Sequence, residues 1–230
     1  MKKIILMAAA VFLFAAGAVN AQEIAKVNGK KITVKDFEKY IENMPPQYKD
    51  RVQEPEVKMG VLENLIVGEL LMQKAKKENL LEKSDVKKKV KERSGEIKKE
   101  ADTQIGMLEK YGGEVEGEEN GDEIKKQIKE RINLFNKQKK NSDEIAKNEV
   151  VIKQMLENRK FKDIKVSNEE IKKQYDGYKN QATQANSEAQ VPKFDEIKED
   201  LRVSLARQKW LNKLKENADI SIDENFVSKK

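Results

Sequence analysis

The sequence predicts a mainly α-helical protein with a small β-hairpin near its N-terminus, a protruding hairpin of two helices, and a short C-terminal strand that closes the domain. Three observations support this fold class. Charged residues make up 38% of the chain and hydrophobic residues 37%, which favours elongated helices with narrow apolar seams. Apolar residues recur three and four positions apart over most of the chain. Alternation typical of strands is confined to residues 24–32 and 218–222.

Residues 1–21 predict a signal peptide. Lys2 and Lys3 precede an apolar run over residues 4–18, and small residues at Val19 and Ala21 flank an expected cut before Gln22. A membrane anchor is the alternative, but the apolar run is shorter than the roughly 20 residues that span a bilayer. We therefore expect export, with the periplasm as the favoured compartment and no stable membrane insertion after cleavage.

The composition narrows the classes of function. The chain has no histidine and no cysteine, so the commonest general base and the commonest zinc ligands are absent. No glycine-rich phosphate loop occurs, and lysines and glutamates are interleaved rather than clustered as in a nucleic-acid site. We expect no catalytic, cofactor-binding or metal-binding residues, no cofactor, and no nucleic-acid partner.

Residues 22–82 predict an N-terminal hairpin followed by core helices. Two short strands, residues 24–27 and 30–32, are joined by Asn28-Gly29, a dipeptide that accepts the positive φ angles of a tight turn. Thr33 then caps a helix that carries Asp36 three positions on. The next helix, residues 56–80, is apolar around much of its circumference and therefore belongs in the middle of a core. We expect its Gly60 and Gly68 to permit close helix approach.

Residues 83–179 predict a helical arm and two return helices. Thin apolar seams over residues 84–111 and 124–135 flank a Gly/Glu-rich turn, which is typical of a helical hairpin. A third helix follows at residues 141–159. Ser167 and Glu170 then form a capping box that starts a helix ending at about Tyr178.

The C-terminal part divides into three segments. Residues 180–193 form a polar linker. Residues 194–222 begin with a long helix, which has an apolar stripe from Phe194 to Leu214 with Trp210 beside it, and end in a short strand that can pair with the N-terminal hairpin. Residues 223–230 are a tail.

Four blocks carry a resemblance to a known family. They are VNGKKITVKDFEKYIENMPP, VLENLIVGELLMQKAKKENL, VSNEEIKKQYDGYK and FDEIKEDLRVSLARQKWLNKLKENADISI, in this order. Their order and spacing resemble the SurA-like and PrsA-like periplasmic or extracytoplasmic foldases, and the resemblance covers most of the chain after the predicted cut. It implies a chaperone module of the SurA N-terminal type, completed by a returning C-terminal helix.

The resemblance also identifies where this chain departs from the family. Relatives commonly insert a parvulin-type prolyl isomerase domain between the third and fourth blocks. Here that place holds only residues 180–193, whereas such a domain needs on the order of a hundred residues. The resemblance therefore implies a chaperone module without its isomerase domain.

The function implied is an ATP-independent chaperone that holds unfolded exported or outer-membrane proteins through a concave apolar surface between core and arm. Its partners would be unfolded polypeptide clients. Adaptable side chains suit such binding. The candidate client contacts are Met44, Met59, Met107, Leu108, Tyr111, Phe135, Met155 and Phe161. Each of them can instead be explained by packing in the core or within the helical hairpin.

Two alternatives from other classes remain open. One is a prolyl isomerase with a non-standard site. The other is an exported helical scaffold or adhesin, in which self-association completes the thin seams. A homodimer is compatible with the chaperone and scaffold interpretations.

Overall fold

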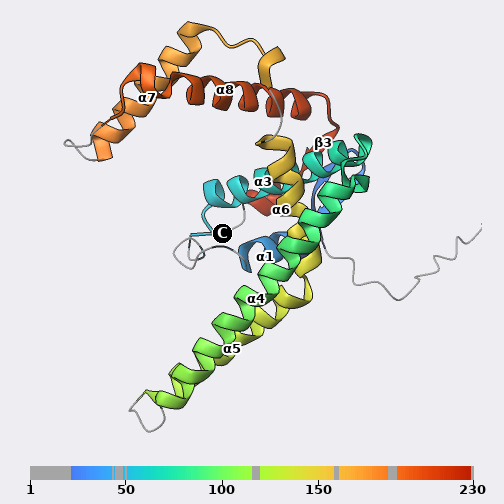
Figure 1. The fold of residues 1–230 in the computed structure, drawn as a ribbon, viewed down its shortest axis with the longest axis vertical. Helices are drawn as coiled ribbons and strands as arrows, with labels where there is room; N and C mark the ends of the chain where they lie inside the picture. Colours follow the sequence, from blue (N-terminus) through green and yellow to red (C-terminus); the bar gives the residue numbers. More distant parts are fainter. Residues whose placement is uncertain are drawn as a thin grey trace, which may run out of the picture.

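The computed structural model describes residues 22–42, 44, 49, 51–115, 120–157, 161–185 and 191–228. Figure 1 shows a central core from which helices project in two directions. Most of the described residues are helical, and a small sheet joins the two ends of this part of the chain, which confirms the predicted fold class. The predicted signal peptide lies outside the described residues.

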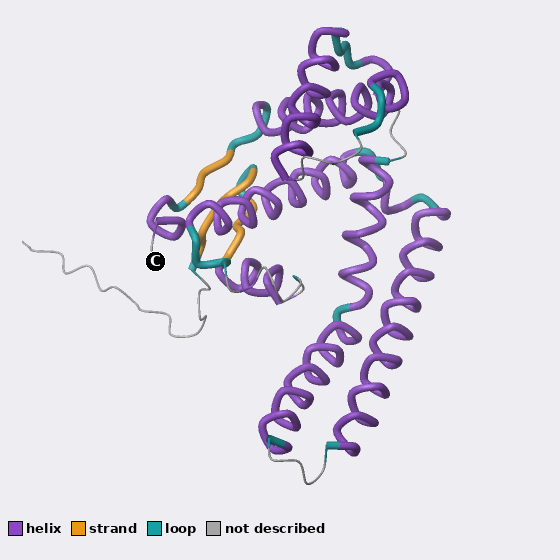
Figure 2. Tube along the Cα trace, turned by 90° about the vertical axis from the view of Figure 1, so that its left-hand side faces the viewer, coloured by secondary structure: helices purple, strands orange, loops and turns teal. Residues whose placement is uncertain are grey.

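The sheet has three antiparallel strands in the order β2-β1-β3. Strands β1 (Glu23–Val27) and β2 (Lys30–Thr33) form the predicted hairpin, and β3 (Ile220–Ile222) pairs with β1. Asn28 and Gly29 both have positive φ, 50° and 81°, as the two central residues of a type I′ turn require. The predicted closure by the C-terminal strand is confirmed, and Figure 2 shows the strands side by side.

Helix α1 (Val34–Glu42) begins at the predicted cap. The Thr33 backbone N–H donates to Asp36 Oδ2 at 2.8 Å, and the Asp36 N–H donates back to Thr33 Oγ1 at 3.3 Å. This reciprocal pair satisfies backbone donors that the first turn of a helix leaves open. Phe37 is thereby placed on the buried side of α1.

Helix α3 (Pro55–Lys77) runs between two hydrophobic clusters and contributes to both. The first core contains the hairpin, α1 and the first two-thirds of α3. The second contains the end of α3, the 3₁₀ turn η1 (Leu80–Glu82) and three later helices. The expectation that Gly60 and Gly68 permit close helix approach is wrong, since a Cβ atom at either position would meet nothing within 4 Å.

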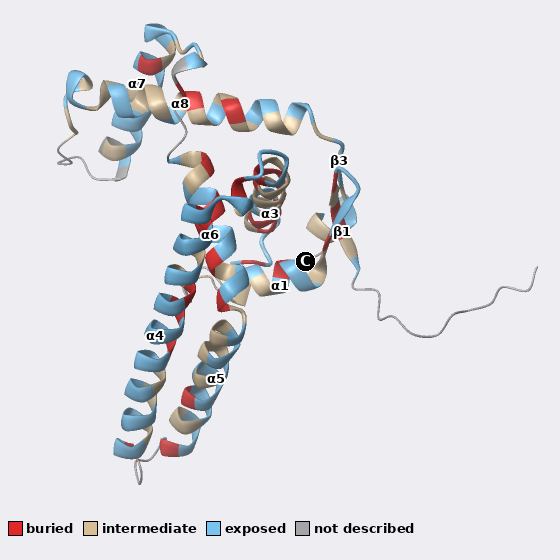
Figure 3. Ribbon diagram, turned by 45° about the vertical axis from the view of Figure 1, so that its right-hand side comes forward, coloured by how far each residue is buried: buried red, intermediate tan, exposed pale blue. Residues whose placement is uncertain are grey.

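Helices α4 (Ser84–Glu114) and α5 (Gly121–Lys140) form the predicted arm, and α6 (Ser142–Leu156) returns to the core. At 1.5 Å per residue, α4 is about 46 Å long. Its first half packs on α6, whereas its second half contacts α5 and leaves the core (Figure 2). Figure 3 shows that exposed residues cover most of the arm, with buried residues confined to its seam.

Helices α7 (Asn168–Ala185) and α8 (Phe194–Glu216) form the second projection (Figure 1). The 3₁₀ turn η2 (Phe161–Asp163) leads into it. The predicted capping box is confirmed, because the Ser167 N–H donates to Glu170 Oε2 at 2.8 Å and the Glu170 N–H donates to Ser167 Oγ. However, α7 continues past the predicted end at Tyr178, so residues 180–185 are helical and not part of a linker.

The predicted tail also differs in the structure. Residues after β3 form a short helix, α9 (Glu224–Ser228), that returns to α3 and α1. The ring of Phe226 meets the ring of Phe37 edge to face, with centroids 5.0 Å apart. This contact joins residues far apart in the sequence, so no local pattern could have predicted it.

Candidate functional site

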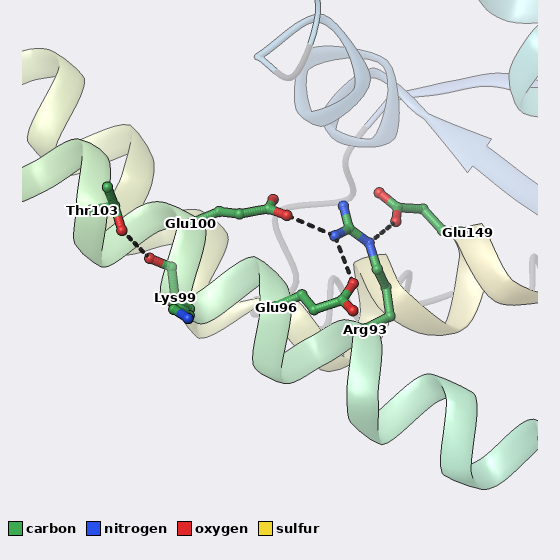
Figure 4. Close-up of polar contacts among 6 residues, drawn as sticks. All are labelled: Arg93, Glu96, Lys99, Glu100, Thr103 and Glu149. Carbon is green, nitrogen blue, oxygen red and sulfur yellow. Dashed lines mark hydrogen bonds and ion pairs between the residues drawn. The ribbon is translucent and has the colours of Figure 1, made fainter.

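The base of the arm is fixed by a network of charges around Arg93 of α4 (Figure 4). Its Nε donates to Glu149 Oε2 of α6 at 2.6 Å, and its Nη1 donates to Glu100 Oε1 at 3.0 Å and Glu96 Oε2 at 3.2 Å. The hydrogen bonds that Arg93 donates to Glu149 and Glu100 raise the pKa of Arg93 above its usual value. One guanidinium therefore connects the arm to α6, which only a planar, multidentate donor can do in this geometry.

A buried polar contact lies one residue further along α4. The hydroxyl of Ser94 is 3.1 Å from the hydroxyl of Ser142, and it also donates to the carboxylate of Asp143. The hydrogen bond from Ser94, followed by the charge of Lys98, lowers the pKa of the Asp143 carboxyl. These polar contacts join the arm helix α4 to the first residues of α6.

Helix α1 contacts the other side of the arm base. Lys39 Nζ lies 2.7 Å from Glu144 Oε2, and Lys137 Nζ lies 2.7 Å from Glu42 Oε1. A small recess opens between these ion pairs. It is lined by Lys39, Glu42, Leu134, Lys137, Gln138, Asn141 and Ile145. The arm is thus braced against the core from two sides.

The outer part of α4 carries the most exposed large apolar side chains of the described residues. Met107 is 60% exposed and Tyr111 is 49% exposed. They lie four positions apart, so their side chains are neighbours on the helix. The helical period places them on the same face as Arg93 and Glu100. At the base of the arm, this face of α4 is charged and contacts α6. Towards the tip of the arm, the same face is apolar and exposed.

The structure separates the eight predicted contact residues into four groups. Met107 and Tyr111 are exposed, whereas Met59, Leu108 and Phe135 are half-buried. Met44 packs against the first core. Met155 and Phe161 are buried in the second core, where the Phe161 and Trp210 rings lie 5.9 Å apart. Client contact by any of the eight stays a prediction, and in this arrangement the exposed pair is the most accessible.

Sequence reasoning missed three further exposed apolar side chains: Tyr40 of α1, Ile152 of α6 and Tyr178 of α7. For Tyr178 a signal was present, since it lies in a polar stretch, whereas Tyr40 adjoins Ile41 and Ile152 directly follows Val151. The signal was weak because isolated surface apolar residues are common in soluble proteins.

The described residues also bear on two other features, a metal site and a membrane-spanning helix. In that part of the chain, no group of three or more acidic side chains is arranged to hold a metal ion. None of the helices described is long and apolar enough to cross a bilayer.

Together, the core, the braced arm with its exposed apolar tip and the second projection define a mainly helical protein with an open shape. Residues 1–100 match the family model of the SurA-like N-terminal domain, which confirms the resemblance to the SurA-like family for this part of the chain. The match includes the hairpin, α1, α3 and the first half of α4. No curated protein and no solved structure matches the chain.

Proposed function

We propose that this protein is an ATP-independent chaperone that holds unfolded exported or outer-membrane proteins through an apolar surface that includes the outer part of its arm. The observation that carries the proposal is the exposed pair Met107 and Tyr111 on a projecting, braced helix. Unfolded polypeptides expose aliphatic and aromatic side chains that such a surface can cover.

The two side chains suit promiscuous and reversible binding. Methionine is flexible and polarisable, so Met107 can adapt to clients of different shape. Tyrosine offers a large apolar ring and a polar hydroxyl, so Tyr111 remains compatible with water when no client is bound. Contacts of this type give modest affinity without fixed hydrogen-bond readout, and release needs no nucleotide.

The proposal includes binding without prolyl isomerisation. Helix α7 ends at Ala185 and α8 begins at Phe194, so residues 186–193 connect them. A domain of about a hundred residues cannot be accommodated in that connection. The middle of α7 is also tied directly to the start of α8, because the Tyr175 hydroxyl donates to the Pro192 carbonyl at 2.9 Å and the Tyr175 and Phe194 rings lie 5.4 Å apart.

The test is suppression of the aggregation of an unfolded outer-membrane protein by the purified protein, without nucleotide. We expect wild type to delay aggregation and the double substitution Met107→Ser, Tyr111→Ser to weaken client affinity about thirtyfold, since each of the two lost apolar contacts costs about 1 kcal/mol. Glu109→Ser with Lys110→Ser is the matched control, because both residues are exposed on the same turn of α4. This control should retain wild-type affinity.

Three outcomes would count against the proposal. Wild type that neither binds the client nor delays its aggregation would exclude holding. Prolyl isomerase activity that survives repurification would favour the enzyme alternative. A complex mass that shows self-association, together with burial of Met107 and Tyr111 and no client binding, would favour a helical scaffold.

A further inference from the structure

The C-terminal helix α9 docks through one aromatic residue. The Phe226 ring meets Phe37 at an interplanar angle of 85°, and Lys58 Nζ lies 5.2 Å from the centroid of the same ring. Lys58 Nζ also donates to the Phe226 backbone carbonyl at 3.4 Å. Phe37 and Lys58 are both buried, with only 4% and 5% of their surfaces exposed.

These contacts recognise features that any polypeptide with an aromatic residue can offer. The Phe37 ring gives an edge-to-face partner for an aromatic side chain. The Lys58 ammonium is attracted to the face of that ring. The same ammonium donates a hydrogen bond to the carbonyl of the aromatic residue, and the distance indicates a weak bond. Ring and carbonyl are thus recognised together, independent of the surrounding sequence.

Helix α9 is attached to the core less firmly than strand β3, which precedes it. Helix α9 has five residues, far fewer than a helix needs to be stable alone. Phe226 and Val227 are only partly buried. The last sheet bond runs from the Asp223 N–H to the Ile24 carbonyl, so residues 224–228 can leave the core while β3 stays paired.

We propose that Phe37 and Lys58 form a subsite for an aromatic residue of an unfolded client, and that Phe226 of the same chain occupies this subsite until a client displaces it. The inference rests on the proposed chaperone function and specifies a second point of client contact, at the core rather than on the arm. A tethered occupant competes at a high effective concentration, so free peptides must bind wild type weakly.

The first experiment uses wild type and two fluorescent peptides. One has the sequence of residues 220–228, ISIDENFVS, and the other carries alanine in place of phenylalanine. We expect hydrogen exchange of residues 224–228 in the protein to rise severalfold at saturation with the phenylalanine peptide and to stay unchanged with the alanine peptide. Unchanged exchange with both peptides at saturation would overturn the proposal.

The second experiment removes the internal occupant. Phe226→Ala should bind the phenylalanine peptide about fivefold or more tightly than wild type, because competition by the tether is lost. Adding Lys58→Met should remove this gain. Circular dichroism checks folding, and Phe226→Leu, which keeps an apolar cover without a ring, gives the same comparison if the alanine variant is unfolded. If the folded Phe226 variants bind the phenylalanine peptide only as tightly as wild type does, the proposed displacement of Phe226 is contradicted.

Aggregation assays on the same proteins distinguish this inference from the proposed function. If the phenylalanine peptide shows no preference for the variants while wild type still suppresses aggregation, the subsite is refuted and the chaperone function stands. If phenylalanine-dependent binding occurs but no protein suppresses aggregation, the chaperone function is refuted, and with it the assignment of the bound segment as a client.

Discussion

At the scale of single residues, Glu170 shows how one carboxylate joins two helices. Its Oε1 lies 2.6 Å from Lys209 Nζ of α8, while its Oε2 accepts the Ser167 N–H at the start of α7. The hydrogen bond from Lys209, followed by that from the Ser167 backbone, lowers the pKa of Glu170 to about 2. The ionised form is therefore the one that stabilises the α7–α8 unit.

This pKa predicts a pH-dependent effect of Glu170→Gln. Because the folded-state pKa lies below the ordinary value of 4.5, the stabilisation is complete above about pH 4.5 and declines as the pH falls towards 2. The variant should therefore lose more stability against urea at pH 6 than at pH 3. Glu169→Gln, an exposed substitution in the same turn, is the control. An equal loss at both pH values for Glu170→Gln would contradict the assignment.

The structural roles of some residues could be predicted from the local sequence, whereas the roles of others could not. Asn28-Gly29, Thr33 and Ser167 act through backbone groups within a few positions, so the sequence alone indicates their roles. Lys58 could not be predicted, because its burial depends on α9, which returns from the other end of the chain. The sequence around Met155 and Phe161 suits surface or core equally, and only tertiary packing decides between the two.

At the scale of elements, the arm should depend on Arg93. Arg93→Lys replaces the guanidinium group, which contacts Glu149, Glu96 and Glu100, with a single ammonium group. We expect a loss of about 1 kcal/mol in the free energy of unfolding at low salt and a smaller loss at 1 M salt, because screening weakens charge pairs. Hydrogen exchange at the α4–α6 junction should rise.

The control for this prediction is Arg131→Lys, an exposed substitution on α5 that should change little. Equal effects of the two substitutions, or an Arg93→Lys effect that does not depend on salt, would show that the network does not brace the arm.

Helix ends were harder to predict than helix positions. The sequence after Tyr178 has almost no charge, which favoured a linker, yet its glutamines and alanines are acceptable helix formers and α7 continues through them. Helix α9 is too short to produce a periodic pattern, and it forms where Phe226 meets Phe37. The arm was predictable because its two seams are long and have the helical period.

At the scale of the whole molecule, α3 couples the two cores. Leu62 lies in the first core and Leu71 in the second, on one continuous helix. Leu62→Ala should cost about 2–5 kcal/mol, as for other buried leucines. We expect it to lower the unfolding midpoint reported by Trp210, although that tryptophan belongs to the second core.

Far-ultraviolet circular dichroism and Trp210 fluorescence should shift together in this variant, as in a two-state transition. A shift in circular dichroism with an unchanged fluorescence midpoint would show that the two cores unfold independently. Leu71→Ala, on the same helix but in the second core, provides the matched comparison.

The position of β1 between β2 and β3 has a consequence for the order of folding. The Asp219 N–H bonds to Asn28 Oδ1 across 191 positions, so the central strand acquires its second neighbour only after synthesis has passed residue 222. The arm, by contrast, pairs helices that are adjacent in the chain and can form early. Before β3 pairs with β1, the first core lacks one of its strands. The nascent protein is then itself an incompletely folded polypeptide with exposed apolar side chains.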